Sequence, residues 1–367
     1  MNELSASGRS HDAIPGADAV WAALRLVAPG TPLREGIDRI LQASMGALIV
    51  VGDTPEVEAI CSGGFPLNVG FTPQRLSELA KMDGAIILTA DTQRVALANV
   101  HLVPDPDVPT SETGTRHRTA ERVARQLRVP VVTVSEEMTV VSIHIGAMKK
   151  TLEPIPRVLA RADQALQILG RYRTRLDTVT ASLSALEVED LVTARDVAEV
   201  LQRSEMVRRI ADEVEGYVIE LGAEGRLVQL QLEELTSGVG DDLRLVCRDY
   251  FVRAPERALD TVLAGLDALD DEELLDPRAL AGVLHLPPDA ELDTSLSPKG
   301  YRVLAKIPRL SEDLGERIVA RFDGLAKLMR AGTAELEEIE GIGEVRARMV
   351  KDGLSRLAEA SILERYS

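Results

Sequence analysis

Residues 157–215 contain no proline and a single glycine, Gly170, and this feature limits the fold more than any other. Apolar residues recur there at spacings of three and four, as in Ala162, Leu166 and Leu169. That period places them on one face of an α-helix, with charged side chains on the remaining faces. The pattern predicts a domain of long, packed helices in the middle of the chain.

The residues before this stretch show a different pattern of apolar residues. Short apolar runs rich in Val and Ile, bounded by glycine or polar residues, are typical of buried strands. Amphipathic stretches between and before them predict helices. Interleaved strands and helices favour an α/β domain with a mixed sheet. We expect strands over 46–53, 84–91, 94–103, 129–136 and 139–146, and helices over 18–27, 32–42, 72–81 and 116–127.

These patterns divide the chain into four parts. We expect a disordered extension over 1–16, an α/β domain over 17–150, a helical linker domain over 151–300 and a helical module over 301–367. The extension is polar and lacks the apolar core of a secretory signal. No apolar run reaches the roughly 18–20 residues that span a membrane. We therefore expect a soluble, cytoplasmic protein.

The formal net charge of −17 argues against a protein that coats nucleic acid nonspecifically, because phosphate neutralisation drives such binding. Residues 301–367 differ from the rest, with twelve basic and twelve acidic side chains. This locally neutral tail is compatible with approach to a polyanion. The two cysteines, Cys61 and Cys247, lie far apart and imply neither a disulfide framework nor a zinc site.

Asp83 and Gly84 form the first candidate functional element. Asp83 stands at the entry to an expected buried strand, where a carboxylate can hold a divalent cation. A glycine beside it lets a nucleotide approach the backbone closely. Taken alone, an Asp-Gly pair is more often a plain turn before a strand.

The second element is TSETGTRHRTAERVARQL, residues 110–127. Thr115 is the expected N-cap of a helix that begins at Arg116. The first turn then combines free amides, the positive end of the helix dipole, Arg116, His117 and Arg118, which suits a triphosphate. Basic side chains oppose the dipole there, and such broken local rules are expected at functional sites. The alternative is a solvated basic helix start. The sequence contains neither a P-loop nor a GxGxxG motif after a strand.

The sequences DGA at 83–85 and GTRHRTAER at 114–122 resemble the two motifs of the diadenylate cyclase family. The likeness covers about residues 15–150. Together with the helical middle and the tail, the architecture is similar to family members that carry a C-terminal helix–hairpin–helix domain. The resemblance implies an enzyme that joins two ATP molecules into cyclic di-AMP and releases pyrophosphate.

The resemblance also implies roles for individual residues. Asp83 would bind Mg²⁺ or Mn²⁺ and help to activate the ribose 3′-hydroxyl, with Arg116 and His117 as the other catalytic residues. Gly84 and Leu102 would line the adenosine, and Ser135 would lie on the phosphate side. The ATP-binding residues implied are Asp83, Gly84, Ala85, Leu102, Thr115, Arg116, His117, Arg118, Thr119 and Ser135.

An assembly is implied as well. Cyclic di-AMP has two equal halves, so two sites that each bind one ATP would meet face to face, and an isologous contact would serve. The family resemblance implies a homo-octamer, association with the nucleoid and binding of branched, Holliday-junction-like DNA.

The segment 336–357 predicts a helix, a GIG turn and a second helix, and it resembles a helix–hairpin–helix motif. Its glycines let the backbone bend and bring amides next to a DNA phosphate, a contact without sequence information. Residues 307–322 look like a degenerate partner hairpin that lacks GxG. The alternative is a plain αα-hairpin. The candidate DNA-binding residues are Gly341, Ile342, Gly343, Arg346, Arg348 and Lys351.

Two further hypotheses stay open at this point. One is a DNA-junction binding protein whose N-terminal domain only senses ATP, and the other is a structural interaction protein built on long helices. The intact Asp83 favours the enzyme, because a pure sensor has no need of a metal carboxylate.

Overall fold

The computed structural model describes residues 16–251, 258–286 and 291–365. The extension expected over 1–16 therefore lies, apart from its last residue, outside the described residues. The chain packs into two compact units. Unit 1 runs to Gln164 and includes Val214–Leu230, whereas unit 2 comprises Ala165–Glu213 and the chain from Gln231 on. This division cuts through long helices, and the predicted domain boundaries stay predictions.

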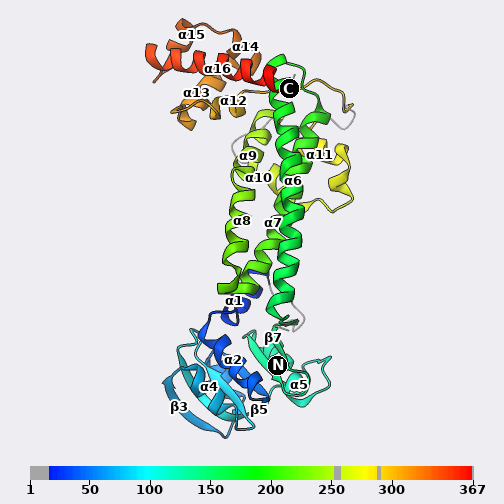
Figure 1. The fold of residues 1–367 in the computed structure, drawn as a ribbon, viewed down its shortest axis with the longest axis vertical. Helices are drawn as coiled ribbons and strands as arrows, with labels where there is room; N and C mark the ends of the chain where they lie inside the picture. The colour runs from blue at the N-terminus through cyan, green and yellow to red at the C-terminus, as the bar shows by residue number, and fades with distance from the viewer. Residues whose placement is uncertain (1–15, 252–257, 287–290, 366–367) are drawn as a thin grey trace, which may run out of the picture. The chain divides into compact units, whose positions relative to one another are not determined.

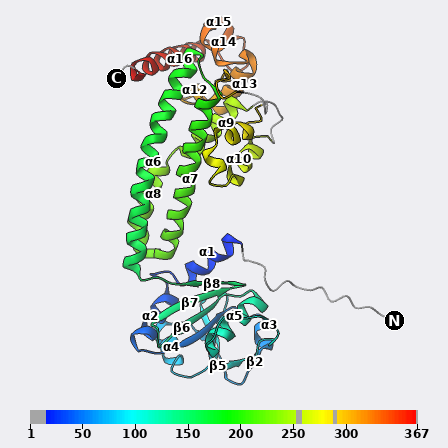
Figure 2. The ribbon, with the colours of Figure 1, turned by 90° about the vertical axis from the view of Figure 1, so that its right-hand side faces the viewer.

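An eight-stranded mixed sheet forms the centre of unit 1 (Figures 1 and 2). The strand order is β2-β5-β4-β1-β6-β7-β8, and β3 also pairs with β5. The pair β1 and β4 is parallel, and the other pairs of the described residues are antiparallel. The strands are β1 (Ala47–Val51), β2 (Cys61–Ser62), β3 (Phe65–Gly70), β4 (Ala85–Leu88), β5 (Arg94–Leu102), β6 (Val131–Ser135), β7 (Val140–Ile145) and β8 (Met148–Thr151).

The predicted α/β class with a mixed sheet is confirmed, and all five expected strands are present as β1, β4, β5, β6 and β7. The sequence analysis missed β2, β3 and β8. These strands are short or largely exposed, and β3 contains Pro66, so none shows the apolar run that marks a buried strand.

Both faces of the sheet are covered by helices. Alternate residues of β1 point to opposite faces, so Ile49 belongs to one apolar cluster and Val50 to the other. The first cluster receives side chains from α1 (Ala17–Leu26), α2 (Pro32–Gln42) and α4 (Pro73–Leu79). The second is covered by α3 (Pro55–Ala59) and α5 (Thr115–Leu127).

Local signals explain where most of these helices begin. The Thr31 side chain accepts a hydrogen bond from the Arg34 amide at 3.1 Å, and Pro32 occupies the first position of α2. The expected N-cap of α5 is wrong by one residue. Gly114 takes the extended N-cap conformation, Thr115 is already helical, and no side chain caps the helix.

The predicted helical middle of the chain is confirmed by two long helices, α6 (Ile155–Glu189) and α7 (Ala194–Leu221). Shorter helices follow them along the chain, and none of the helices in the described residues is long and apolar enough to cross a membrane. These shorter segments are η1 (Gly222–Gly225), α8 (Arg226–Thr236), α9 (Val239–Tyr250), α10 (Ala258–Ala268), η2 (Glu273–Leu275) and α11 (Pro277–Val283).

The last part of unit 2 is helical, as predicted, and its helices pack around one apolar cluster. A buried polar group ties α12 to α6 and α9. Arg302 Nη1 donates to Glu187 Oε1 at 2.6 Å, and Asp249 accepts from the amides of Gly300, Tyr301 and Arg302. The helices are α12 (Tyr301–Ala305), α13 (Glu312–Phe322), α14 (Leu325–Arg330), α15 (Thr333–Glu337) and α16 (Glu344–Arg365).

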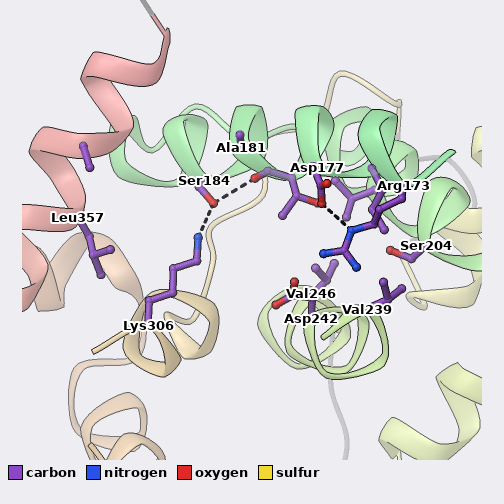
Figure 3. Close-up of a pocket in the computed structure, with 14 residues that line it drawn as sticks. Arg173, Asp177, Ala181, Ser184, Ser204, Val239, Asp242, Val246, Lys306 and Leu357 are labelled. Carbon is purple, nitrogen blue, oxygen red and sulfur yellow. Dashed lines mark hydrogen bonds and ion pairs between the residues drawn. The ribbon is translucent and has the colours of Figure 1, made fainter. Parts of the chain in front are cut away.

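A cavity of about 360 Å³ lies within unit 2 (Figure 3). Its lining comes from α6, α7, α9, α16 and the end of α12. Arg173 pairs with Asp177 at 2.9 Å on one side, and Lys306 donates to Ser184 at 3.1 Å on the other. The charged ends of Arg173 and Lys306 are thus held by neighbouring residues of the lining.

Candidate active site and DNA interface

Predicted site residues gather at one edge of the sheet, namely the edge formed by the ends of the strands where β1 and β4 begin. Gly46 precedes β1 and Gly84 precedes β4, and both lie at the same edge because these two strands are parallel. The strands β6 and β5 are antiparallel to them, so their ends at Ser135 and Leu102 reach that edge too. Asp83 stands beside Gly84. The structure therefore brings together residues from four separate segments.

Arg116, in the first turn of α5, extends its side chain to this edge. Its Nη2 lies 3.5 Å from Asp83 Oδ1, which joins the two predicted motifs directly. Its guanidinium also lies against Gly46, where an added Cβ would come within 2.1 Å of Nη1. A side chain at Gly46 would displace this guanidinium, so Gly46 adjoins the candidate site, and the sequence analysis did not single it out. The available signal was a glycine directly before a buried strand.

The Asp83 carboxylate is open to ligands. Its side chain is 99% exposed, and a 3.5 Å ion pair in that setting is weak. No cluster of three or more metal-ligating side chains occurs in the part of the chain that the structure describes. One carboxylate suits Mg²⁺, which commonly binds one or two carboxylates together with substrate phosphates. The donor set therefore fits a cation that is shared with a nucleotide.

The beginning of α5 has the features of an anion site. The first helical hydrogen bond runs from the Arg118 amide to the Gly114 carbonyl at 2.8 Å, so the amides before Arg118 lack helical partners. The first turn contains no acidic residue. Thr115 is exposed, and Thr119 Oγ1 donates to its carbonyl at 2.9 Å. Free amides and basic side chains together attract negative charge.

His117 faces the sheet with one ring nitrogen. Nδ1 lies 3.2 Å from Thr133 Oγ1 of β6, and His144 of β7 lies behind Thr133. Partial burial lowers the pKa of His117, and the nearby Lys149 and Arg116 charges lower it further against the opposing effect of Glu112. The sequence analysis missed Thr133 and His144, because both interrupt apolar strands by a single residue.

The remaining predicted ATP residues are more enclosed. An added Cβ on Gly84 would lie 2.5 Å from the Asn99 backbone, so close packing of β4 on β5 already requires glycine there. The side chains of Ala85 and Leu102 are buried in the cluster beneath α5. Ser135 Oγ accepts a hydrogen bond from the Met138 amide at 3.3 Å, which holds the turn after β6.

A buried glutamate anchors the loop that leads into α5. Glu121 accepts from Thr110 Oγ1 at 2.6 Å, from the Ser111 amide at 2.9 Å and from Arg125 at 2.8 Å. Burial alone would raise the pKa of Glu121, but these hydrogen bonds hold it below its usual value. The carboxylate stays charged and fixes the loop at Thr110 and Ser111, which leads to Thr115.

Two hairpins of the same form occur in the C-terminal helices. In the second, between α15 and α16, Gly341 has φ +92°. In the first, between α12 and α13, the corresponding position is Arg309 with φ +66°. The predicted degenerate partner thus adopts the bent backbone without a glycine, at some strain.

Hydrogen bonds match between the two hairpins. The Ile307 amide donates to Leu304 and the Ile339 amide to Leu336, at 3.0 and 3.2 Å. After the bend, Gly315 donates to Ser311 at 3.0 Å, and the equivalent bond in the second hairpin, from Ala347 to Gly343, measures 2.9 Å. The two helix–turn–helix segments are therefore structural repeats of one another.

The predicted DNA residues divide into two groups. Gly341, Gly343 and the side chains of Arg346 and Arg348 are exposed at or just beyond the second hairpin. Arg348 pairs with Glu344, and Arg346 donates to the Gly341 carbonyl. Ile342 is buried in the apolar cluster, and Lys351 donates to the carbonyls of Met329 and Ala331. The contacts of these last two residues in the structure are within the module, and their roles toward DNA stay predictions.

Comparison with known proteins defines the class of the α/β domain. Residues 34–148 match the family described as DisA bacterial checkpoint controller nucleotide-binding, and residues 152–292 match the DisA bacterial checkpoint controller linker region. The first match contains both candidate motifs. The protein is a diadenylate cyclase, and the resemblance drawn from its motifs is confirmed.

Relatives that align over the whole chain define the family more closely. The DNA integrity scanning protein DisA of Frankia alni is 53% identical over 354 residues, which cover 96% of this chain and 99% of the relative. The same protein of Acidothermus cellulolyticus is 52% identical over 99% of this chain and 100% of its own length. That of Streptomyces coelicolor is 49% identical over 100% and 99%. The chain belongs to the DisA family.

Solved structures are similar over a smaller part. A hypothetical membrane spanning protein from Bacillus cereus is 25% identical and covers 34% of this chain and 62% of its own, with a TM-score of 0.30. DacA from Staphylococcus aureus is 22% identical and covers 36% and 83%, with a TM-score of 0.26.

Proposed function

We propose that this protein condenses two ATP molecules into cyclic di-AMP and two pyrophosphates at the sheet edge beside α5, and that branched DNA bound by its C-terminal hairpins changes the rate. The observation that carries the catalytic half is the meeting of Asp83 with Arg116 at 3.5 Å, at a helix start that has three uncapped amides. A carboxylate and an anion site side by side suit a reaction that links a hydroxyl to a phosphate.

Each half-reaction forms one bond and breaks one. The ribose 3′-oxygen of one ATP attacks the α-phosphorus of the other, the bond from that phosphorus to the bridging oxygen breaks, and pyrophosphate leaves. Asp83 is the proposed acceptor of the 3′-hydroxyl proton. Arg116, His117 and the amides of α5 hold the triphosphate and neutralise the charge that develops on the leaving group.

A divalent cation completes the site. Diadenylate cyclases use divalent metals, and we propose Mg²⁺ or Mn²⁺ here, held by Asp83 and the nucleotide phosphates. When bound, such an ion neutralises phosphate charge and makes the 3′-hydroxyl more acidic. The single exposed carboxylate supports a shared cation rather than a cage made of protein ligands.

In this proposal one chain binds only one of the two ATP molecules that the reaction joins. The product has two equivalent halves, and Asp83 is 99% exposed in one chain. We propose that two copies meet face to face through an isologous contact that covers both sites, within a homo-octamer. Size measurement with and without ATP, by light scattering, tests the assembly, and an active monomer would contradict it.

The catalytic half is tested by incubating the purified protein with ATP and either metal ion and identifying the products by mass. Cyclic di-AMP with pyrophosphate is expected. Asp83→Asn should abolish product, whereas Asp53→Asn, an exposed aspartate at the opposite end of β1, should retain it. ATP binding without product under both metals would instead favour a DNA-junction binding protein whose N-terminal domain senses ATP.

The proposal that this protein binds branched DNA rests on the two C-terminal hairpins. Gly341 and Arg309 bend the backbone in the same way, and exposed amides at such turns can bind DNA phosphates. Two hairpins offer two phosphate sites on one module. This arrangement supports recognition of DNA shape rather than of base sequence, as branched DNA requires.

A charge added at the second hairpin tests this assignment. An added Cβ on Gly343 meets nothing within 4 Å, so Gly343→Glu introduces a negative charge without a clash. It should weaken binding of branched DNA and leave basal cyclase activity unchanged. Gly282→Glu on α11, equally free of contacts, is the matched control. Equal DNA affinity of the two variants would defeat the hairpin assignment.

A further inference from the structure

Three polar side chains interrupt an otherwise apolar sheet face beneath α5. Thr133, Ser142 and His144 are each at most 1% exposed, whereas the neighbouring Val131 packs against Ala120 and the rest of the apolar cluster. Burying polar groups costs free energy unless they are hydrogen-bonded. Valine or isoleucine would pack the helix equally well, so packing alone does not account for these residues.

Thr133 lies at the centre of the contacts that these side chains make. Its Oγ1 is 3.2 Å from His117 Nδ1, 3.4 Å from the Ser142 carbonyl and 3.5 Å from His144 Nε2. A hydroxyl has one proton and two lone pairs. When it donates to the Ser142 carbonyl, a lone pair remains for a proton on His117 Nδ1. The other ring nitrogen of His117, Nε2, is then left for a ligand.

We propose that Thr133 is the positioning residue for His117: its hydroxyl accepts from the Nδ1 proton and holds that side of the ring against the sheet, so that Nε2, protonated beside the triphosphate charge, donates to a phosphate oxygen of ATP. This inference rests on the proposed function, which assigns a phosphate contact to His117. Thr133 itself touches no substrate. It acts on the ring, in the way that an outer hydrogen-bond partner orients a histidine ligand.

His144 keeps this support electrically neutral. Its ring centroid lies 6.4 Å from that of His117. Burial and the nearby Lys149 charge lower the pKa of His144 to about 4, against the opposing effects of Glu112 and Glu121. The ring is therefore uncharged near neutral pH and places no positive charge behind His117. Among the residues that the structure describes, its buried Nδ1 has no hydrogen-bond partner, and its contact with Thr133 is made through Nε2.

The hydroxyl matters because the last torsion of a histidine is broad and nearly two-fold. Without the bond to Nδ1 the ring can turn and exchange its two faces. Catalytic geometry tolerates displacements of only about 0.5 Å. Loss of the outer partner of a metal-bound histidine typically lowers affinity or activity by about 10–100-fold, and we expect a loss at the lower end of that range here.

A pair of substitutions separates the hydroxyl from the methyl group of Thr133. Thr133→Val keeps the shape and removes the hydroxyl, and kcat for cyclic di-AMP formation should fall about tenfold with the fold intact. Thr133→Ser keeps the hydroxyl and should restore kcat to within about threefold. Thr151→Val, the same change two strands along the sheet, is the control and should be unchanged. Equal losses in the valine and serine variants, or no loss in either, would overturn the proposal.

A double-mutant cycle tests whether Thr133 acts through His117. In a His117→Ala background, Thr133→Val should cause no further loss, because the ring that it positions is gone. A further tenfold loss would show another route and overturn the inference. If His117→Ala is fully active, the proposed phosphate contact of His117 fails. If His117→Ala is inactive and Thr133→Val is active, only the present inference fails.

A spectroscopic measurement keeps the test open if Thr133→Val does not fold. Nitrogen-15 imidazole spectra of the wild-type protein with ATP should show His117 protonated at Nδ1, and Thr133→Ser should give the same pattern. An Nδ1 without a proton in the ATP complex would contradict the proposed geometry, whatever the activity of the variants.

Discussion

The buried imidazole of His144 makes the stability of unit 1 depend on pH in a predictable way. The side chain is 1% exposed, and its pKa is lowered to about 4, first by burial and then by Lys149. An unfolded histidine titrates near pH 6.5. The unfolded state therefore binds the proton more tightly than the folded state does. The contribution of His144 to the free energy of unfolding is fully present above about pH 6.5 and is lost as the pH falls toward about 4.

The size of the effect follows from the two pKa values. With pKa values of about 4 folded and about 6.5 unfolded, linkage costs about 2 kcal/mol at about pH 5 relative to neutral pH. His144→Phe keeps a ring in the same space and removes the titration. The difference in unfolding free energy between wild type and variant should therefore fall by about 2 kcal/mol from about pH 7.5 to about pH 5.

Urea unfolding followed by tryptophan fluorescence measures this difference. Trp21 is the single tryptophan of the chain and packs against the cluster that includes Ile143 and Val134, so its emission reports on unit 1. Subtracting the unfolding free energy of the variant from that of the wild type cancels the contributions of groups that titrate equally in both proteins. A difference that stays constant within about 0.5 kcal/mol over this pH range would refute the conclusion that His144 is held neutral by burial.

Three other outcomes are expected. Gly84→Ala places a Cβ 2.5 Å from the Asn99 backbone, so unit 1 should lose about 1–3 kcal/mol in urea unfolding and cyclase activity should fall; unchanged values would contradict the close approach. Arg302→Met leaves the buried Glu187 carboxylate unpaired and should destabilise unit 2 by about 3–5 kcal/mol in circular dichroism melts, partly recovered by adding Glu187→Gln. Gly341→Ala forces a side chain to φ +92° and should weaken branched-DNA binding in a gel-shift assay, whereas full affinity would argue against a rigid hairpin.

The interior of the fold was predictable where one short segment carries its own signal. The apolar runs that form β1 and β4 are buried at every position, and their short length, β-branched residues and flanking glycines favour a strand in a covered sheet. The long helices α6 and α7 follow from the same kind of local evidence. Edge strands such as β3 were not predictable, because their exposed residues show no apolar pattern.

The tail shows that a hairpin can keep its backbone form without its signature glycines. Without GxG, residues 307–322 predict only a degenerate hairpin. In the structure Arg309 adopts φ +66°, and the surrounding hydrogen bonds repeat those around Gly341. The packing of Ile307 and Leu304 in the common core holds this backbone, a constraint that does not depend on glycine.

By itself the sequence determined the class of fold, the two motifs and hence the cyclase family, because strand and helix periodicity and short motifs are properties of neighbouring residues. Only the tertiary structure decided which distant groups meet. Arg116 reaches Asp83 across 33 residues and fits over Gly46, and His117 reaches Thr133 across 16. Such contacts depend on strand order and helix placement, which the whole apolar core sets at once.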